Sequence, residues 1–195
     1  MRWKEMREAC LKYMFTYSKK GAVIPGTDGN NKDFLLAMPE AANIVIHDIL
    51  RVYPNIRFYT AQKEEAEAEF NMHTILGKKF MRFADDAADD ALSYRILPDG
   101  DTLLAEAGYA GEFRIYYHEA PEPITSDTAD DFEPNLKEDA AVLVPLGMAA
   151  ELFKEDEESI AATLWNEYAQ RLEALGAGRM RSGEAPYIST TGWVK

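Results

Sequence analysis

The sequence predicts an α+β fold, in which N- and C-terminal helix pairs form a four-helix bundle with an inserted antiparallel β module. Three observations support this prediction. Apolar residues recur every three or four positions near both ends of the chain, as on the buried stripe of a helix. Between these ends, short runs rich in aromatic and β-branched residues replace the helical period. The length of 195 residues suits one domain, or one core with a modest insertion.

The first helix is expected over about residues 3–19, because its larger apolar residues follow a single helical stripe. Lys19, Lys20 and Gly21 then provide cations for the last carbonyls and a residue that tolerates a left-handed conformation. A loop rich in Gly, Asp and Asn follows over residues 22–32. The stripe comprises Trp3, Met6, Cys10, Leu11, Met14 and Tyr17.

A second helix is expected from Asp33, whose side chain can cap it, to Tyr53, which precedes Pro54. Pro39 either kinks this helix or marks its true first turn, since proline has no backbone N–H to donate. The apolar residues of the segment share one side, which is therefore expected to face the core: Phe34, Leu35, Met38, Ala41, Ala42, Val45, Ile49 and Leu50.

Residues 55–123 are expected to form the β module. Asp99-Gly100 separates two candidate strands and predicts a hairpin, since glycine accepts positive φ without steric conflict. Residues 108–111 provide the next turn, so residues 92–118 are expected to form a three-stranded meander. Residues 63–69 fit either a short helix or a charged edge strand. The candidate strands are 56–59, 80–83, 93–97, 102–105 and 113–117.

The C-terminal pair is expected to be an antiparallel helical hairpin. Residues 136–153 are apolar over much of the circumference and predict one deeply buried helix, despite Pro145. After a break at residues 154–156, a last helix is expected over residues 157–175, with Gly176 ending it.

These elements divide the chain into three parts. Residues 1–54 plus 124–178 are assigned to the helical bundle, and residues 55–123 to the β insertion. Residues 179–195 are assigned to an extended C-terminal tail with isolated aromatic residues. A proline-containing, acidic connector over residues 121–134 is expected to join the insertion to the last helices.

Charge and cysteine content argue against several classes of protein. The chain has 21 Lys and Arg against 34 Asp and Glu, a net charge of −13, so it has no general attraction for nucleic acid or anionic lipid. The single Cys10 cannot form an intrachain disulfide and does not require an oxidising compartment. Charges are spread through residues 1–8 and leave no apolar h-region, so no signal peptide is expected. No apolar run approaches 18 residues, so no membrane span is expected.

Motifs for catalysis are missing from the sequence. The common nucleotide-binding, zinc-protease and hydrolase signatures do not occur, so no catalytic residue, cofactor site or metal site is assigned. His47, His73 and His118 fall in different elements and could share zinc only by tertiary convergence. Residues 28–33 superficially resemble a calcium loop, but a turn followed by a helix cap fits them better.

Two features of the predicted β module suggest alternatives. Residues 85–90 contain four aspartates, which an enzyme could use with a divalent metal, although a solvated acidic turn is the favoured interpretation. Aromatic residues could instead form a platform for a carbohydrate or peptide. Strand alternation places Phe113 and Tyr117 on the face opposite Tyr116, so at least one set belongs to the core. The aromatic set comprises Tyr94, Tyr109, Phe113, Tyr116 and Tyr117.

Several segments together suggest a known type of protein. Residues 111–125 (GEFRIYYHEAPEPIT) precede an acidic linker, and residues 143–152 (LVPLGMAAEL) and 166–172 (NEYAQRL) follow it. Near the N-terminus, residues 33–39 (DFLLAMP) lead into an amphipathic helix. This arrangement resembles the neck proteins of tailed bacteriophages, the head–tail connector or adaptor family. The resemblance covers most of the chain except residues 60–92 and the tail.

The resemblance implies a structural virion protein that is made in the host cytoplasm and forms a ring under the portal. Such a ring connects head and tail and lines the channel through which DNA passes without specific binding. Its partners would be copies of itself, the portal protein and other neck or tail proteins, joined by head-to-tail contacts. The candidate interface residues lie in the tail, where they could anchor it on a neighbour: Arg179, Arg181, Tyr187 and Trp193.

Overall fold

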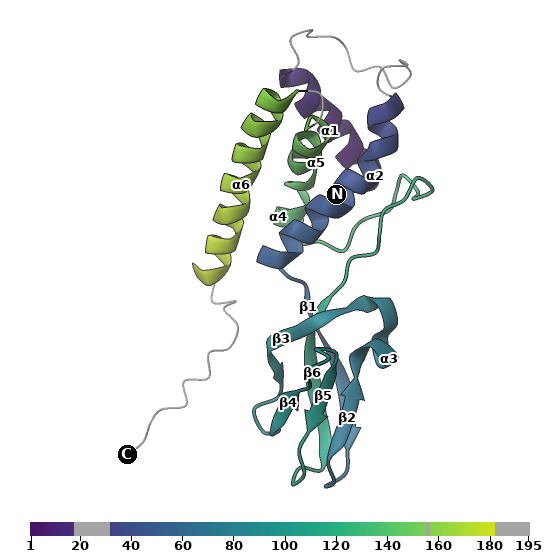
Figure 1. Cartoon of the computed structure of the whole chain (residues 1–195), viewed down its shortest axis with the longest axis vertical. Coiled ribbons are helices and arrows are strands. Elements are labelled where there is room, and N and C mark those ends of the chain that lie inside the picture. The colour runs from purple at the N-terminus through teal and green to yellow at the C-terminus, as the bar shows by residue number, and fades with distance from the viewer. Residues whose placement is uncertain (18–31, 155–156, 182–195) are drawn as a thin grey trace. The chain divides into compact units, whose positions relative to one another are not determined.

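The structure is a computed structural model that describes residues 1–17, 32–154 and 157–181 (Figure 1). It confirms the α+β class: two small three-stranded antiparallel sheets are inserted between N- and C-terminal helices. The chain divides into a helical unit, Met1–Tyr53 with Pro121–Arg179, and a β unit, Pro54–Ala120.

One hydrophobic core joins the helices of the helical unit. Helix α5 (Val144–Leu152) contacts both α1 (Trp3–Tyr17) and α2 (Lys32–Val52). Helix α6 (Glu158–Arg181) adds Ala161, Leu164 and Tyr168 to the same core and runs antiparallel to α5 (Figure 1). Five residues of the apolar stripe predicted for the first helix are buried: Trp3, Met6, Cys10, Leu11 and Met14. The side chain of its last member, Tyr17, lies outside what the structure describes.

Helix α2 begins at Lys32, so Asp33 lies in its first turn rather than before it. Pro39 lies inside the helix, and the interpretation that it marks the first turn is wrong. The predicted end of the first helix at residue 19 and the loop that follows fall outside the described residues.

The prediction of a single helix over residues 136–153 is wrong. The segment forms two helices, α4 (Glu138–Ala141) and α5, with a break at Val142 and Leu143. Pro145 accounts for the break, because it cannot donate to the carbonyl of Ala141 and instead occupies the first turn of α5.

The last helix continues beyond its predicted end. Helix α6 runs through Gly176 to Arg181, so residues 179–181, assigned to the extended tail, are helical. A Cβ atom at Gly176 would lie 2.8 Å from Cγ1 of Val52. This glycine therefore permits close approach of α6 to the end of α2 and does not end the helix.

The β unit contains all five predicted strands and one more. Its larger sheet has the order β1 (Ile56–Lys63), β6 (Gly111–Glu119), β3 (Phe80–Ala88). The smaller sheet has the order β2 (Ala68–Asn71), β5 (Thr102–Ala105), β4 (Tyr94–Ile96). The ambiguous segment 63–69 is thus mostly a turn that leads into β2. A short helix, α3 (Met72–Leu76), and a 3₁₀ turn, η2 (Gly77–Lys79), lead into β3.

The hairpin predicted at Asp99-Gly100 is confirmed, since β4 and β5 pair across it. The meander predicted over residues 92–118 is wrong, because β5 pairs with β2 and β4, whereas β6 pairs with β1 and β3. Strand β6 is flanked on both sides, so it has no free edge for β5.

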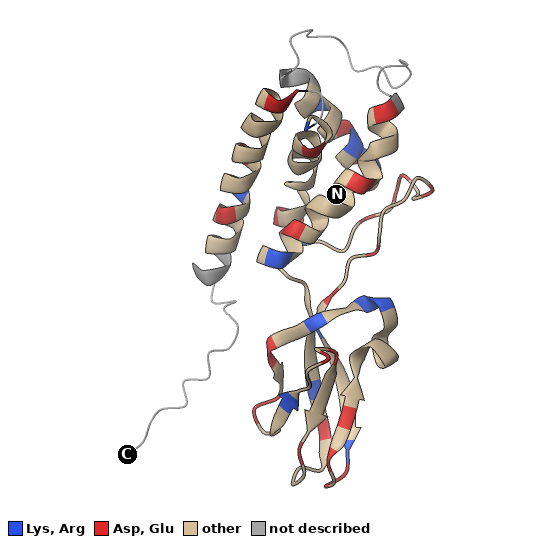
Figure 2. Ribbon diagram, in the orientation of Figure 1, with Lys and Arg blue, Asp and Glu red and all other residues tan. Residues whose placement is uncertain are grey.

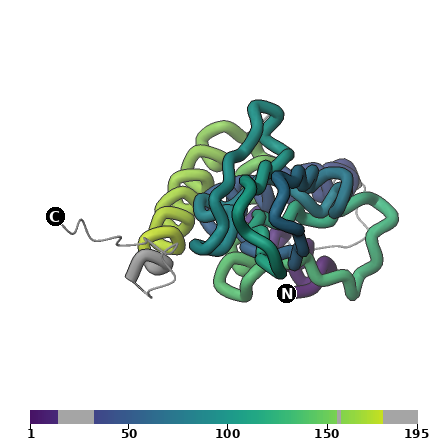
Figure 3. Tube along the Cα trace, turned by 90° about the horizontal axis from the view of Figure 1, so that it is seen from below, coloured from purple at the N-terminus to yellow at the C-terminus, as the bar shows by residue number. Residues whose placement is uncertain are grey.

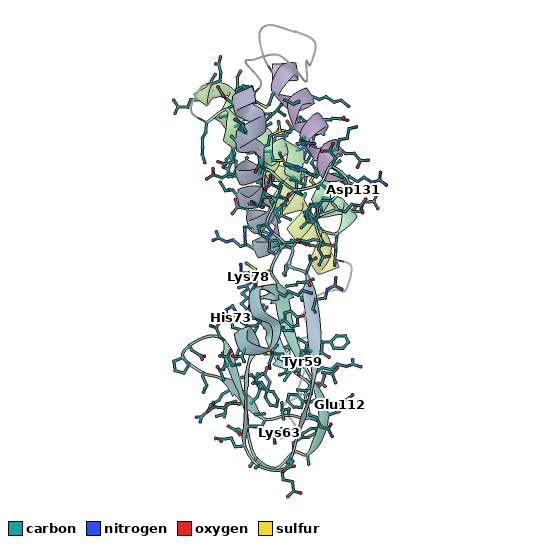
Figure 4. All side chains as sticks on the ribbon, turned by 90° about the vertical axis from the view of Figure 1, so that its right-hand side faces the viewer. Tyr59, Lys63, His73, Lys78, Glu112 and Asp131 are labelled. Carbon is teal, nitrogen blue, oxygen red and sulfur yellow. The ribbon has the colours of Figure 1, made fainter. Side chains whose placement is uncertain are left out.

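Buried Lys63 ties the loops of the β unit together. Its Nζ donates to three carbonyl oxygens, those of Glu64 (3.0 Å), Glu106 (3.0 Å) and Tyr109 (2.7 Å). Figure 4 shows Lys63 near one end of the β unit and His73 and Lys78 toward the other. The ammonium group has three N–H donors, and each donates to a loop carbonyl that takes no part in strand pairing.

Candidate functional site

The residues that the sequence singled out as an interface are only partly described. Tyr187 and Trp193 lie outside the described residues. Arg179 and Arg181 lie in the last turn of α6, and the structure describes only their backbone. This part of the prediction therefore stays untested.

The acidic turn predicted at residues 85–90 is confirmed only in part: a turn begins at Asp89, whose carbonyl accepts from the N–H of Leu92 (2.9 Å), and includes Asp90. Asp85 and Asp86 lie in strand β3 with exposed side chains. The carboxylate of Asp89 accepts hydrogen bonds from the backbone N–H of Arg114 (2.8 Å) and the hydroxyl of Tyr116 (3.0 Å). Asp89 thus fastens the end of β3 to β6. Across the described ranges, no group of three or more His, Cys, Asp or Glu side chains is placed to hold a metal ion.

The histidines and the cysteine have separate surroundings. His47 is exposed on α2, whereas the imidazole of His118 is buried in the β unit and its Nδ1 accepts a hydrogen bond from Nε of Arg82 (3.0 Å). Nε2 of His73 lies 3.6 Å from Oδ1 of Asp101. Cys10 is fully buried, as its position on the predicted apolar stripe implies, and this burial raises the pKa of its thiol well above the usual range.

Most side chains of the predicted aromatic platform are buried in the β unit or hydrogen-bonded within it. Phe113 and Tyr117 are buried in the core, as alternation predicted. Tyr94 Oη accepts a hydrogen bond from the backbone N–H of Ala87 (2.9 Å), and the Tyr109 hydroxyl donates to the carbonyl of Glu112 (2.7 Å). With Tyr116 bonded to Asp89, the hydroxyl groups of three candidate tyrosines already have partners within the unit.

One exposed aromatic ring remains on the larger sheet. Phe58 is 53% exposed on β1, directly opposite Tyr116 on β6, and the two rings meet edge to face at 6.3 Å. The guanidinium of Arg114 lies over the Phe58 ring, 4.8 Å from its centre. Among the described residues, neither Arg114 nor Arg82 has a carboxylate partner for its guanidinium. We call Phe58, Arg82, Arg114 and Tyr116 the outer sheet face.

A groove runs along the solvent side of α2 in the helical unit. It is a shallow depression open to solvent, with a volume of about 640 Å³. Leu36, Glu40 and Ile44 follow one another at four-residue intervals along its α2 wall, and Leu36 is 65% exposed. We call the space lined by these residues, Pro39 and Ile124 the α2 groove.

The connector forms the second wall of the α2 groove. Asn43 holds it there, because its amide donates to the carbonyl of Ile124 (2.8 Å) and accepts from the N–H of Ile124 (2.9 Å). Farther along, the connector curves past the start of α1 (Figure 3), where the N–H of Trp3 donates to the carbonyl of Phe132. Arg7 of α1 also pairs with Asp130. These contacts hold the wall in place.

Neither the α2 groove nor the outer sheet face is predicted from the sequence. A signal for the groove was present, since Leu36 and Ile44 are apolar residues outside the buried stripe of their helix. Phe58 gave no comparable signal, because a strand with two faces can bury either set of alternate residues.

No known family matches the chain, and no curated protein is similar to it in sequence. None of the helices in the described ranges is both long enough and apolar enough to span a membrane.

Proposed function

We propose that this protein is a structural component of the neck of a tailed bacteriophage, without catalytic activity. In this role it forms a ring under the portal, connects head and tail, and lines the DNA channel in the virion after synthesis in the host cytoplasm. The observation that carries the proposal is the resemblance of residues 33–39, 111–125, 143–152 and 166–172 to the connector or adaptor family. The order of helices, β insertion and helices agrees with it.

The architecture supports an assembly role. The N- and C-terminal helices share one hydrophobic core, and the β unit has a second core of its own. We infer that α1, α2, α5 and α6 act as the four-helix bundle that this role calls for. An inserted unit with its own core can present a separate contact surface, as a head-to-tail ring requires.

The charge distribution supports passage of DNA without binding. Residues 121–173 carry 14 Asp and Glu against 3 Lys and Arg, so most of the net charge of −13 comes from this segment. Figure 2 shows acidic residues along the ribbon of both units. Carboxylates that face a channel repel phosphate within roughly 8 Å at physiological salt.

The carbohydrate or peptide module is the second candidate, and Phe58 is the one observation that favours it. Its ring and that of Tyr116 meet at 62°, whereas a sugar platform needs rings that share a flat surface. A glycan or peptide screen in which Phe58→Ala and Tyr116→Ala abolish binding would favour this candidate over the connector.

The experiment for the connector is co-expression with the portal protein encoded beside it, followed by purification and electron microscopy. We expect a ring-shaped complex of the two proteins, and we expect the chain among the proteins of purified virions by mass spectrometry. The proposal fails if the chain is missing from purified virions, or if it does not associate with the portal even in assembled particles.

A further inference from the structure

We propose that the α2 groove of one copy receives Phe58 and Arg114 from the outer sheet face of a second copy. This inference rests on the proposed function, since it assigns the head-to-tail contact that a ring needs. It concerns contacts between copies and names the two surfaces that meet.

Apolar complementarity is the first argument. Phe58 projects a ring that is 53% exposed, and Ile56, two residues earlier on the same face of β1, is 40% exposed. The α2 groove offers apolar walls at Leu36 and Ile44, which are 65% and 42% exposed, with Ile124 beneath them. Joining the two surfaces would remove from water the large apolar side chains that each exposes.

Charge complementarity is the second argument. Glu40 lies between Leu36 and Ile44 on the groove wall, and its carboxylate has no partner among the described residues. Arg114 lies beside Phe58, and its guanidinium likewise has no carboxylate partner there. Phe58 with the adjacent Arg114 is thus complementary to the groove wall, where Glu40 lies between two apolar side chains. Such pairing fixes the register of a contact.

A second copy is the occupant that the charges favour. An isologous contact would bring Glu40 near Glu40 of the second copy, or Arg114 near Arg114, so repulsion between like charges disfavours it. The outer sheet face presents Arg82 and Arg114, and the carboxylate of Asp89 beside them already accepts hydrogen bonds from Tyr116 and the N–H of Arg114. The groove lining presents Glu40, and its other opposite charges, Asp48 and Arg51, lie 3.8 Å from each other. Because both complementary surfaces occur on one chain, each copy can bind the next, and such a contact closes into a ring when the rotation permits.

Disulfide trapping in the full chain tests the contact directly. Thr60→Cys places a thiol opposite Arg114 on the exposed face of β1, and Ser126→Cys places one in the connector at the groove. Both replacements are small and leave Phe58, Arg114 and Glu40 in place. Native Cys10 is fully buried and does not compete. A chain with Ile96→Cys, on the exposed side of β4, replaces the Thr60→Cys partner as the matched control.

We expect mild oxidation of the mixed Thr60→Cys and Ser126→Cys proteins to give a disulfide between copies. Its yield, measured by mass spectrometry of linked peptides, should exceed the Ile96→Cys control by at least about tenfold. Equal yields would overturn the proposal. A chain carrying both cysteines that instead closes an internal disulfide as a monomer would overturn the assignment to a second copy.

Exchanging the charges of Arg114 and Glu40 provides an independent test. Arg114→Glu should lower the cross-link yield by about tenfold or more through repulsion by Glu40, and adding Glu40→Arg should restore it. Arg95→Glu, an exposed reversal on β4, should leave the yield unchanged, and circular dichroism checks that each variant folds. Failure of Glu40→Arg to restore the yield would count against the pairing.

The outcomes for this contact and for the proposed function are distinguishable. If cross-linking fails while the chain is recovered with the portal, only the contact is wrong. If the copies cross-link as expected while the chain is missing from virions, only the phage neck role is wrong.

Discussion

The helical unit buries mainly aliphatic and small side chains, whereas the β unit buries a cluster of aromatic rings. In the helical unit, packing depends on how closely the helices approach one another. A Cβ atom at Gly147 would lie 2.7 Å from Cγ1 of Val45 and 3.0 Å from the ring of Tyr168. Helices satisfy their own backbone hydrogen bonds, so their association depends on how closely side chains interlock.

The β unit is stabilised by side-chain hydrogen bonds as well as by packed aromatic rings. Phe80 and Phe83 meet at 5.1 Å, and Phe70 and Phe113 at 5.3 Å, as edge-to-face pairs. Its short strands leave loop carbonyls and N–H groups that no ladder pairs, and Lys63 and Asp99 satisfy several of them. A small β unit therefore needs side-chain hydrogen bonds where a helical unit needs close packing.

Phe113→Ala is expected to have the largest effect on stability and to destabilise the β unit without the helical unit. Removing this buried ring should destabilise the β unit by about 3–5 kcal/mol, since it leaves a cavity beside Phe70 and Tyr109. Hydrogen exchange in urea should show lost protection in β1 and β6 with α5 unchanged. The matched control, exposed Phe58→Ala, should change stability by less than about 1 kcal/mol. Equal loss of protection in α5 would mean that the units unfold together.

Gly147→Ala should act on the helical unit alone. The added methyl group meets Val45 and Tyr168 at distances that force side chains or helices apart, so we expect a loss of about 2–3 kcal/mol. Gly176→Ala is the control, because Val52, its neighbour, is 40% exposed and can move aside. Thermal unfolding followed by circular dichroism measures both variants. A larger loss for Gly176→Ala would contradict this account of the helical core.

Lys63→Met tests how much the hydrogen bonds of the Lys63 ammonium group stabilise the β unit. The replacement keeps most of the side-chain length but leaves three carbonyls without their donor, so we expect a loss of about 1–2 kcal/mol. Urea unfolding of Lys63→Met and of Lys78→Met, whose side chain is exposed, provides the comparison. If the two variants lose the same stability, the three hydrogen bonds contribute nothing measurable.

Asp99 should give the smallest effect, a dependence of the β4–β5 turn on pH. The hydroxyl of Thr102 and the N–H groups of Asp101 and Thr102 donate to its carboxylate and hold its pKa below the ordinary value. Because the folded pKa is the lower one, this stabilisation is complete above about pH 5 and is lost as pH falls through the folded pKa. Amide exchange at Thr102 should therefore quicken relative to reference amides at low pH.

The variant Asp99→Asn should remove this dependence on pH, whereas Asp90→Asn, at an exposed aspartate, should retain it. Retention of the same pH profile in Asp99→Asn would assign the effect to another carboxylate.

Local patterns were enough to locate most elements. The helical stripe ending at Tyr17, the hairpin at Asp99-Gly100 and the burial of Phe113 and Tyr117 each follow from the spacing or type of neighbouring residues. The break before Pro145 was also available locally. The apolar character of residues 136–153 favours one continuous helix, whereas the missing N–H of proline favours a break, and in the structure the proline decides.

The candidate site was less accessible to sequence reasoning. Exposure of Leu36 could be suspected from its position outside the stripe, but the groove exists only because Asn43 binds the backbone of Ile124, 81 residues away. Likewise, Arg114 reaches Phe58 only through the pairing of β6 with β1.

The sequence by itself determined the types and the order of most elements and the acidic charge, because these depend on composition and on residues a few positions apart. Tertiary structure decided which strands pair, that Gly176 lies within α6 against Val52, and that Leu36 and Phe58 remain on the surface. Those outcomes depend on contacts between residues distant along the chain, where several partners satisfy the same local pattern and only packing of the whole unit selects one.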